Sequence, residues 1–137
     1  MSYKMWLQTY LRHPLQLGAI FPSGSRLSSL MVRHIMADTN GPILELGPGT
    51  GSFTRALLEK GVPEENLVLL EQSPDFTTLL RNSFPKATVI CGDAKNVVAL
   101  SRPLGIEEFT EIVSGIPLNA MGGQLRQTKC SEAFKLL

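Results

Sequence analysis

A short apolar run followed at once by a glycine-rich loop is the feature that most constrains this chain. Residues 43–46 read Ile-Leu-Glu-Leu, and residues 47–51 read Gly-Pro-Gly-Thr-Gly. Phe53 to Lys60 then has a helical pattern, and Gly61 is placed to end that helix. A strand, a tight glycine turn and a helix in this order are typical of the first unit of a parallel α/β fold.

Further strands and helices alternate along the chain at regular spacing. Three more strands are expected at 67–71, 87–91 and 109–113, and the first of these is so apolar that both its faces should be buried. Ser73-Pro74-Asp75 is a strong helix start, because it offers a capping hydroxyl, a proline at the first helical position and an acid in the first turn. The remaining helices are expected at residues 26–36, 73–82, 95–100 and 124–137. This alternation predicts β-α-β units and a Rossmann-like parallel sheet with additional N-terminal helices.

The composition is that of a globular protein. The 137 residues are 43% hydrophobic and 18% charged, with a mean hydropathy of +0.08, so there is enough apolar material for a core. A net charge of +1 excludes a polybasic nucleic-acid binder. No apolar run approaches the roughly 20 residues needed to span a bilayer. The two cysteines, Cys91 and Cys130, cannot form a disulfide framework, and the prediction is a cytoplasmic protein.

The N-terminal segment is basic and amphipathic. Residues 1–37 contain no Asp or Glu, and Pro14 favours a helix end at or before His13. An apolar helical face at spacing i, i+3, i+4, i+7 and i+8 is formed by Tyr3, Trp6, Leu7, Tyr10 and Leu11. Two interpretations stay open for this face. It packs on the core, or it lies in a membrane interface, where Trp and Tyr suit the headgroup level and nearby basic residues meet anionic lipid.

Acidic residues end or follow three of the expected strands. Glu45 precedes the glycine loop, Glu71 ends the strand at 67–71, and Gly92-Asp93-Ala94 follows the strand at 87–91. An acid about 20 residues after such a loop binds ribose hydroxyls in nucleotide-binding folds, and an Asp in the third position can meet an adenine amino group. Because parallel strands bind ligands at their carboxyl ends, these residues predict one nucleotide-type site.

These residues resemble the S-adenosylmethionine-dependent class I methyltransferases. The resemblance covers about residues 43–119, and it implies that the loop wraps the methionine part of S-adenosylmethionine, that Glu71 binds the ribose and that Asp93 approaches the adenine. The close glycine spacing suits a ligand without a pyrophosphate. The resulting candidate cofactor-binding residues are Glu45, Gly47, Gly49, Thr50, Gly51, Glu71, Gln72, Asp93, Ala94 and Ser114.

A narrower resemblance reaches towards the N-terminus. Residues 11–25 (LRHPLQLGAIFPSGS), the loop after Glu45 and residues 114–118 (SGIPL) are similar to bacterial phospholipid N-methyltransferases. That family methylates the amine of phosphatidylethanolamine, places a basic amphipathic helix on the membrane and closes the segment matching 18–25 over the cofactor. The resemblance therefore implies peripheral attachment to the inner membrane and favours the membrane interpretation of the N-terminal face. Candidate substrate or membrane residues are Trp6, Tyr10, Arg12, Ser23, Arg26 and Pro117. No catalytic base can be named and no metal is expected.

The ribosomal RNA adenine N6-dimethyltransferases are the nearest competing family. They share the Leu-Gly-Pro-Gly-Thr-Gly loop and the Gly-Asp-Ala segment, but their hallmark after the fourth strand is Asn-Leu-Pro-Tyr. This chain has Gly115-Ile116-Pro117-Leu118 there, so the amide that fixes the target amine and the aromatic ring that stacks on the base are both missing. Two further functional classes stay open, namely a cofactor-binding module without catalysis and a membrane-associated scaffold.

The expected domain organisation is an N-terminal helical segment at 1–40 and a Rossmann-like cofactor domain at 41–137. Class I methyltransferases usually have seven strands and this sequence offers four, so the sheet is expected to be incomplete at the C-terminus. The strand at 109–113 would then lie at an edge and support a homodimer or cause poor solubility. Cys91 is expected in the core, and Glu107-Glu108 is expected in a solvated turn.

Overall fold

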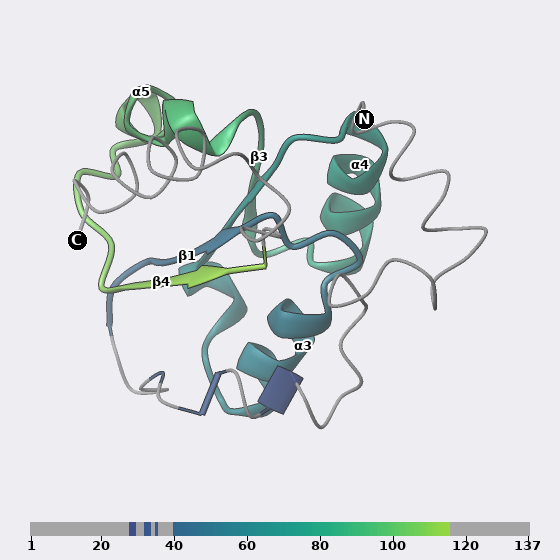
Figure 1. Ribbon diagram of the computed structural model, residues 1–137. Helices are drawn as coiled ribbons and strands as arrows, with labels where there is room; N and C mark the ends of the chain where they lie inside the picture. The colour runs from purple at the N-terminus through teal and green to yellow at the C-terminus, as the bar shows by residue number, and fades with distance from the viewer. Residues whose placement is uncertain (1–27, 30–31, 34, 36–39, 116–137) are drawn as a thin grey trace, which may run out of the picture.

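A four-stranded parallel sheet forms the centre of the computed structural model, which describes residues 28–29, 32–33, 35 and 40–115 (Figure 1). The strands lie side by side in the order β3-β2-β1-β4. Their bounds are β1 Ile43–Leu46, β2 Leu67–Glu71, β3 Thr88–Cys91 and β4 Glu111–Ser114. The α/β parallel sheet predicted from the alternation of elements is confirmed.

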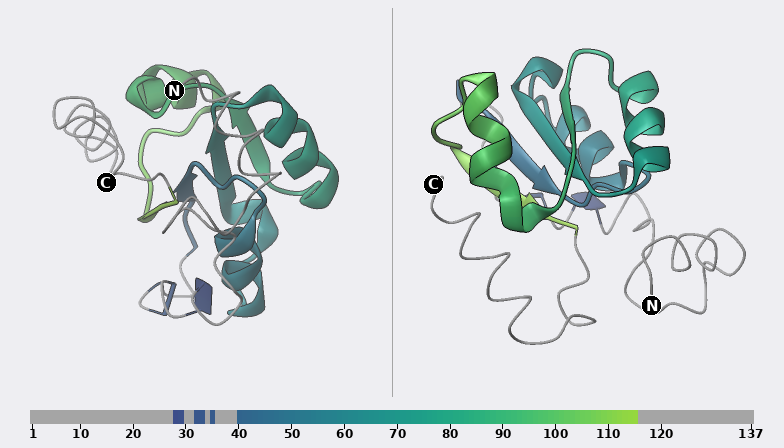
Figure 2. Two further views of the ribbon diagram at one scale, coloured as in Figure 1. Left: turned by 45° about the vertical axis from the view of Figure 1, so that its right-hand side comes forward. Right: turned by 90° about the horizontal axis from the view of Figure 1, so that it is seen from above.

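Helices cover both faces of this sheet (Figure 2). The α-helices are α3 Ser52–Glu59, α4 Pro74–Ser83 and α5 Val97–Ser101. Short 3-10 helices are η2 Glu64–Asn66, η3 Ala94–Asn96 and η4 Arg102–Leu104. Residues of α3 and α4 pack in one hydrophobic cluster and residues of α5 in another, so α3 and α4 share one face of the sheet and α5 covers the opposite face.

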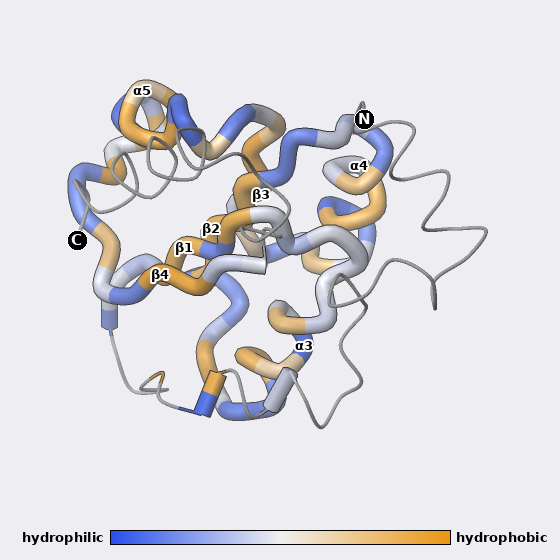
Figure 3. Tube along the Cα trace, viewed as in Figure 1, coloured by the Kyte–Doolittle hydropathy of each residue, from blue (hydrophilic) through white to orange (hydrophobic). Residues whose placement is uncertain are grey.

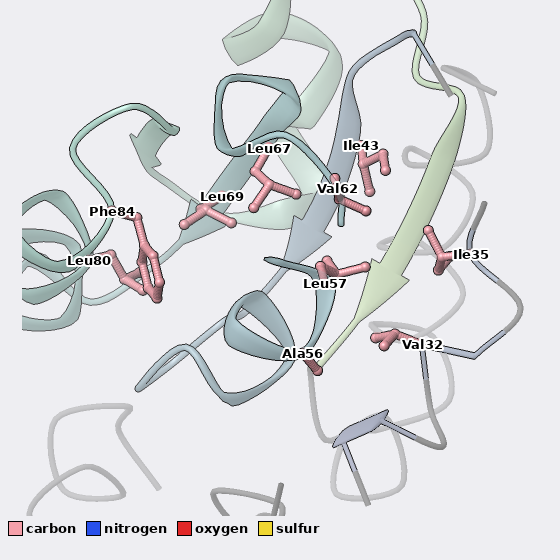
Figure 4. Packing of buried hydrophobic residues seen from close by; sticks show 10 residues of the cluster. All are labelled: Val32, Ile35, Ile43, Ala56, Leu57, Val62, Leu67, Leu69, Leu80 and Phe84. Atoms are coloured by element: carbon pink, nitrogen blue, oxygen red, sulfur yellow. The ribbon is translucent and has the colours of Figure 1, made fainter. Parts of the chain in front are cut away.

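The register of the strands explains why β1 and β2 are apolar at every position except Glu45 and Glu71. Ile43 pairs with Leu67, and Leu44 pairs with Val68. Ile43, Leu67 and Leu69 point into the cluster beneath α3 and α4, where Leu57, Leu80 and Phe84 meet them (Figure 4). The intervening residues of both strands enter the α5 cluster. Both central strands are therefore buried on two faces, and hydrophobic colour follows them through the middle of Figure 3.

Most expected bounds of the elements agree with the structure. The strands at 43–46 and 67–71 are confirmed to the residue, and the hydroxyl of Ser73 accepts from the backbone N–H of Phe76 at the start of α4. The fourth strand begins at Glu111 rather than Phe109. Phe109 is buried because it fills the α5 cluster just before the strand starts, so its apolar character reflects packing outside the ladder.

Two further expectations need correction or restriction. Cys91 is exposed, not in the core, because it is the last residue of β3, which lies at the edge of the described sheet. Of the helix expected at 26–36, Ser28 and Ser29 are helical, while the described residues from 32 onward form a turn and a bend. Glu107 and Glu108 are both exposed, as expected, although they lie in a segment without regular structure that follows the turn at Gly105. The helix expected at 124–137 lies outside the described residues.

The described residues before Asn40 pack on the α3 face of the sheet. Val32 and Ile35 belong to the same hydrophobic cluster as Leu57. The Lys60 ammonium, just after α3, donates to the carbonyl oxygens of Val32 at 2.9 Å and Arg33 at 2.6 Å. These contacts join this segment to α3 and to the sheet beneath it. Among the residues that the structure describes, none lies in a helix that is long and apolar enough to cross a membrane.

Candidate functional site

The carboxyl ends of the four strands converge on one edge of the sheet. The chain passes from β1 to β2 on one side and reaches β4 on the other, so the strand order reverses at β1. Such a switch point is where open parallel sheets bind ligands. The loops that start there stay close to the strands, because Gly47 N–H donates to the Leu70 carbonyl and Gly115 N–H donates to the Leu46 carbonyl.

The glycine loop at 47–51 adopts a conformation that other residues rarely take. Gly49 has φ of 57° and Gly51 has φ of 87°, and Gly51 forms the N-cap of α3 without any side-chain hydrogen bond. A Cβ on Gly51 would lie 2.7 Å from Cε2 of the buried Phe84 ring, whereas a Cβ on Gly49 would meet nothing within 4 Å. The loop is therefore packed tightly against the core at Gly51 and borders open space at Gly49.

Arg55 holds the outer side of this loop. Its guanidinium Nη2 donates to the Thr50 carbonyl at 2.8 Å, and its Cζ lies 5.9 Å from the centre of the Phe84 ring. The cation–π contact and the hydrogen bond together fix the carbonyl side of the loop.

Glu71 ties the end of β2 to the same loop. The residue is 1% exposed, and its carboxylate accepts from two backbone N–H groups. Gly49 N–H donates to Oε2 at 3.0 Å, and Ser73 N–H donates to Oε1 at 2.9 Å. A buried carboxylate needs such donors to offset its lost hydration. The Glu71 carboxylate therefore joins the glycine loop to the start of α4.

Glu45 lies on the same face of the sheet with far fewer partners. The Thr54 hydroxyl in the first turn of α3 donates to its Oε2 at 2.6 Å, and its fully buried Oε1 has no hydrogen-bond partner among the described residues. Burial raises the pKa of Glu45 to about 7, and the neighbouring Glu71 charge adds to the increase. The Thr54 hydrogen bond and the Arg55 charge oppose the increase without cancelling it.

The remaining candidate cofactor residues reach the same edge. Asp93 follows β3, is half-buried, and accepts on Oδ1 from the Lys95 N–H at 3.0 Å. Gln72 is exposed just after β2, and Ser114 is the last residue of β4. Ala94 is 4% exposed and packs in the α5 cluster, so its backbone is the part available to a ligand.

Thr54 and Arg55 are site residues that the sequence interpretation missed. Thr54 precedes the fully buried Leu57 by three positions, which places it on the face of α3 that packs on the sheet. A polar residue on that face directly after an acidic strand end is the signal that could have identified it. The candidate substrate and membrane residues, by contrast, lie outside the described residues; they are Trp6, Tyr10, Arg12, Ser23, Arg26 and Pro117.

Two kinds of curated protein are similar in sequence. The ornithine lipid N-methyltransferase of Singulisphaera acidiphila is 29% identical over 129 residues, which cover 92% of this chain and 67% of that protein. The ribosomal RNA small subunit methyltransferase A of Maridesulfovibrio salexigens is 33% identical over 88 residues, which cover 64% of this chain and 33% of that protein. No protein-family model matches the chain.

Solved methyltransferases share the fold. The CcbJ methyltransferase of Streptomyces caelestis has a TM-score of 0.63 at 21% identity, covering 85% of this chain and 48% of that one. The glycopeptide N-methyltransferase MtfA, solved with S-adenosylmethionine, has a TM-score of 0.62 at 22% identity, covering 85% and 49%. The chain has the fold of the class I S-adenosylmethionine-dependent methyltransferases and is similar in sequence to curated methyltransferases. It spans about half the length of these two solved proteins and a third of the ribosomal RNA enzyme.

The residues at the switch point fit S-adenosylmethionine, the cofactor of this family. The buried Oε1 of Glu45 lacks a partner among the described residues, and the backbone at Gly49 borders open space. Glu71 and Asp93 supply carboxylates at the ends of β2 and β3. The cofactor is a cation with ribose hydroxyls and an adenine amino group, so acidic acceptors spaced along one edge match its chemistry.

The packing of the loop predicts different effects at two of its glycines. Gly51→Ala should lower the free energy of unfolding by roughly 2–4 kcal/mol, because a left-handed conformation and a clash with Phe84 both add to the cost. Gly49→Ala, the matched control, should cost only about 1 kcal/mol, since it has the same left-handed strain and no clash. Urea denaturation of both variants measures the difference, and equal losses would contradict the packing of Gly51 against Phe84.

The buried Glu45 predicts a particular dependence of stability on pH. Its pKa rises from 4.5 in the unfolded chain to about 7 on folding, so the folded state holds the extra proton between these values. Its contribution to stability is complete below pH 4.5 and is lost as the pH rises through about 7, a total of roughly 3 kcal/mol. Glu45→Gln should remove this loss and gain stability over wild type at alkaline pH.

Urea denaturation across this pH range, run on wild type and Glu45→Gln together, measures the effect. Glu59→Gln is the control, since Glu59 is exposed at the end of α3. Parallel stability curves for wild type and Glu45→Gln would show that Glu45 has an ordinary pKa.

Proposed function

We propose that this chain transfers a methyl group from S-adenosylmethionine to the amine of a membrane lipid. Cofactor binding is supported by one observation. Three acids, Glu45, Glu71 and Asp93, lie at the carboxyl ends of neighbouring strands beside the glycine loop, at the switch point of the sheet. When bound, S-adenosylmethionine supplies an electrophilic methyl group on a positively charged sulfur. The protein then has to hold the cofactor and align a neutral amine with that methyl group.

The described residues divide this work. In this proposal Glu71, which accepts from the Gly49 N–H, also accepts from the ribose hydroxyls, and Asp93 at the end of β3 meets the adenine amino group. The backbone of the glycine loop, which is held by Arg55 and Phe84, contacts the methionine part of S-adenosylmethionine in this proposal. Ser114 ends β4 at the switch point, and its hydroxyl is the candidate group for orienting the amine.

The backbone at Gly115 favours a lipid amine over an adenine. This position corresponds to the Asn of the Asn-Leu-Pro-Tyr segment in the adenine dimethyltransferases. Gly115 packs so closely that an added Cβ would lie 2.9 Å from the Gly47 carbonyl oxygen and 3.3 Å from the Phe53 ring. An Asn side chain would therefore push against the glycine loop itself. The sequence omits the amide, and the packing leaves no room for it.

The extent of the similarity also supports a lipid acceptor. The match to the ornithine lipid N-methyltransferase covers 92% of this chain and 67% of that protein, whereas the match to the ribosomal RNA small subunit methyltransferase A of Chlorobium phaeobacteroides covers 89% of this chain but 40% of that protein. The acid-free residues 1–37, with an aromatic and basic helical pattern, suit contact with an anionic membrane surface. Ornithine lipids and phosphatidylethanolamine both present a primary amine at that surface, so the lipid amine is the proposed acceptor class.

Methyl transfer from labelled S-adenosylmethionine tests the proposal directly. One mixture contains liposomes with both phosphatidylethanolamine and ornithine lipid, together with ribosomal RNA. We expect label in the organic phase, and thin-layer chromatography then identifies which lipid carries it. Glu71→Gln should lose most of this label and at least about tenfold in cofactor affinity, because it removes a buried charged acceptor.

Two results of this assay would contradict the proposal. Label in the RNA fraction would make the chain an adenine methyltransferase in spite of Gly115. Cofactor binding without label in any fraction would identify a binding module without catalysis. The exposed Glu59→Gln variant is the control for general effects of charge removal.

The membrane part of the proposal has its own test. Changing Trp6 and Tyr10 together to Ala should weaken flotation with anionic liposomes by about tenfold or more, because two interfacial aromatic anchors are lost. Affinity for S-adenosylmethionine should stay the same, since the described cofactor residues lie at the sheet edge. Changing Leu79 and Leu104, which are exposed on the folded domain, to Ala is the matched control. Unchanged flotation of the Trp6 and Tyr10 variant would contradict a membrane-binding face.

A further inference from the structure

The carboxyl group of Glu45 is poorly satisfied for a buried acid. It lies between the end of β1 and the first turn of α3, with no solvent exposure. One hydroxyl, from Thr54, donates to Oε2, and Oε1 has no partner among the described residues. An ionised carboxylate in such a place lacks the donors that normally offset lost hydration. A protonated carboxyl group tolerates the same surroundings far better.

The charges around Glu45 do not supply the missing partner. From β2 the neighbouring group is Glu71, which has the same sign and repels a second anion. From α3 it is Arg55, but this guanidinium bonds to Thr50 and lies over Phe84. From β4 the residue paired with Glu45 is Val113, which is apolar. The loop at 47–51 has no titratable side chain.

We propose that Glu45 is a positioning residue that holds a proton in the ligand-free protein and releases it to solvent when cationic S-adenosylmethionine binds. The proposal rests on the cofactor binding stated under the proposed function. It adds that the affinity for S-adenosylmethionine depends on pH through the protonation of Glu45. The released proton leaves Glu45 as an anion, and the cation of the ligand becomes the counter-charge that the protein itself lacks.

The chemistry of the cofactor explains why binding would drive this ionisation. S-adenosylmethionine carries a positive ammonium group, a positive sulfonium centre and one negative carboxylate, so it is a cation overall. A nearby positive charge favours the ionised form of a carboxyl group, and an ammonium can donate charge-assisted hydrogen bonds. An acid with an unpartnered oxygen beneath the loop therefore gains both charge and donors when the ligand arrives. Glu71, already bonded by two backbone N–H groups, has less need of them.

Calorimetry of S-adenosylmethionine binding measures the released proton. Titrations in two buffers with different ionisation enthalpies give the number of protons per bound ligand at each pH. We expect nearly one proton released at about pH 6 and almost none above about pH 8. The affinity should rise about tenfold per pH unit below neutrality and then become constant. Binding that is independent of pH, with no released proton, would overturn the proposal.

Variants at two positions separate linkage from a structural role. Glu45→Gln should abolish both the proton release and the pH dependence of the affinity. Thr54→Val removes the hydroxyl that stabilises the anion, so the pH midpoint should move upward, and Thr54→Ser should restore it. The exposed Glu59→Gln is the matched control and should behave as wild type. A Thr54→Val variant with an unchanged midpoint would overturn the role given to Glu45.

A measurement without ligand tests the protonation of Glu45 separately from cofactor binding. The carboxyl carbon of Glu45, assigned by NMR from the signal lost in Glu45→Gln, should titrate near neutral pH in the free protein. An ordinary acidic midpoint would overturn the proposal even if the cofactor binds. Failure of S-adenosylmethionine to bind at any pH would instead overturn the proposed function, and the linkage with it.

Discussion

The pair of hydrogen bonds made by the Glu71 carboxylate is the interaction on which the site depends. Burying this acid is costly, and the cost is offset because Oε2 accepts from Gly49 and Oε1 accepts from Ser73. The bonds join the end of β2, the glycine loop after β1 and the start of α4 at one point. Without these hydrogen bonds, a loop with several glycines could adopt many backbone conformations. The Glu71 carboxylate therefore restricts the conformation of the glycine loop.

Two acids on one face of the sheet thus have different roles. Glu71 has two backbone donors and organises the loop, whereas Glu45 has one hydroxyl donor and a pKa raised by burial to about 7. The alternation of the strands requires this proximity, because Glu45 pairs with Leu69 and so lies two residues from Glu71 on the neighbouring strand. A site for a cation can use both kinds of acid. Glu71 holds the loop through its backbone donors, and in the linkage proposed above Glu45 responds to the charge of the ligand.

How far the sequence predicts such a structure depends on whether a residue's environment is local. The strands at 43–46 and 67–71 are predictable to the residue because burial on both faces makes them apolar apart from one glutamate each. Ser73-Pro74 starts α4 by local capping chemistry. Phe109 and Cys91 mislead for the opposite reason. The sequence alone does not show whether an apolar residue near a strand belongs to the ladder. Phe109 instead packs in the core just before β4, and Cys91 is exposed at the end of the edge strand β3. The acids at strand ends are visible in the sequence, but the role of Thr54 arises from a tertiary contact.

The close packing at Gly115 connects this architecture to the choice of acceptor. In this chain the segment after β4 approaches the glycine loop so nearly that a single added carbon would press on the Gly47 carbonyl. An enzyme that fixes its target amine with an amide at this position needs more space between the two loops. The distance between β4 and β1 is set by their ladder, which pairs Leu46 with Ser114 and continues in the bond from Gly115 to Leu46. A side chain at position 115 therefore requires a shift of the backbone after β4 or of the glycine loop. On this argument the acceptor amine has to be oriented by the backbone or by Ser114 rather than by an amide at position 115. A flexible lipid amine at a membrane surface meets that requirement more easily than a base stacked in RNA.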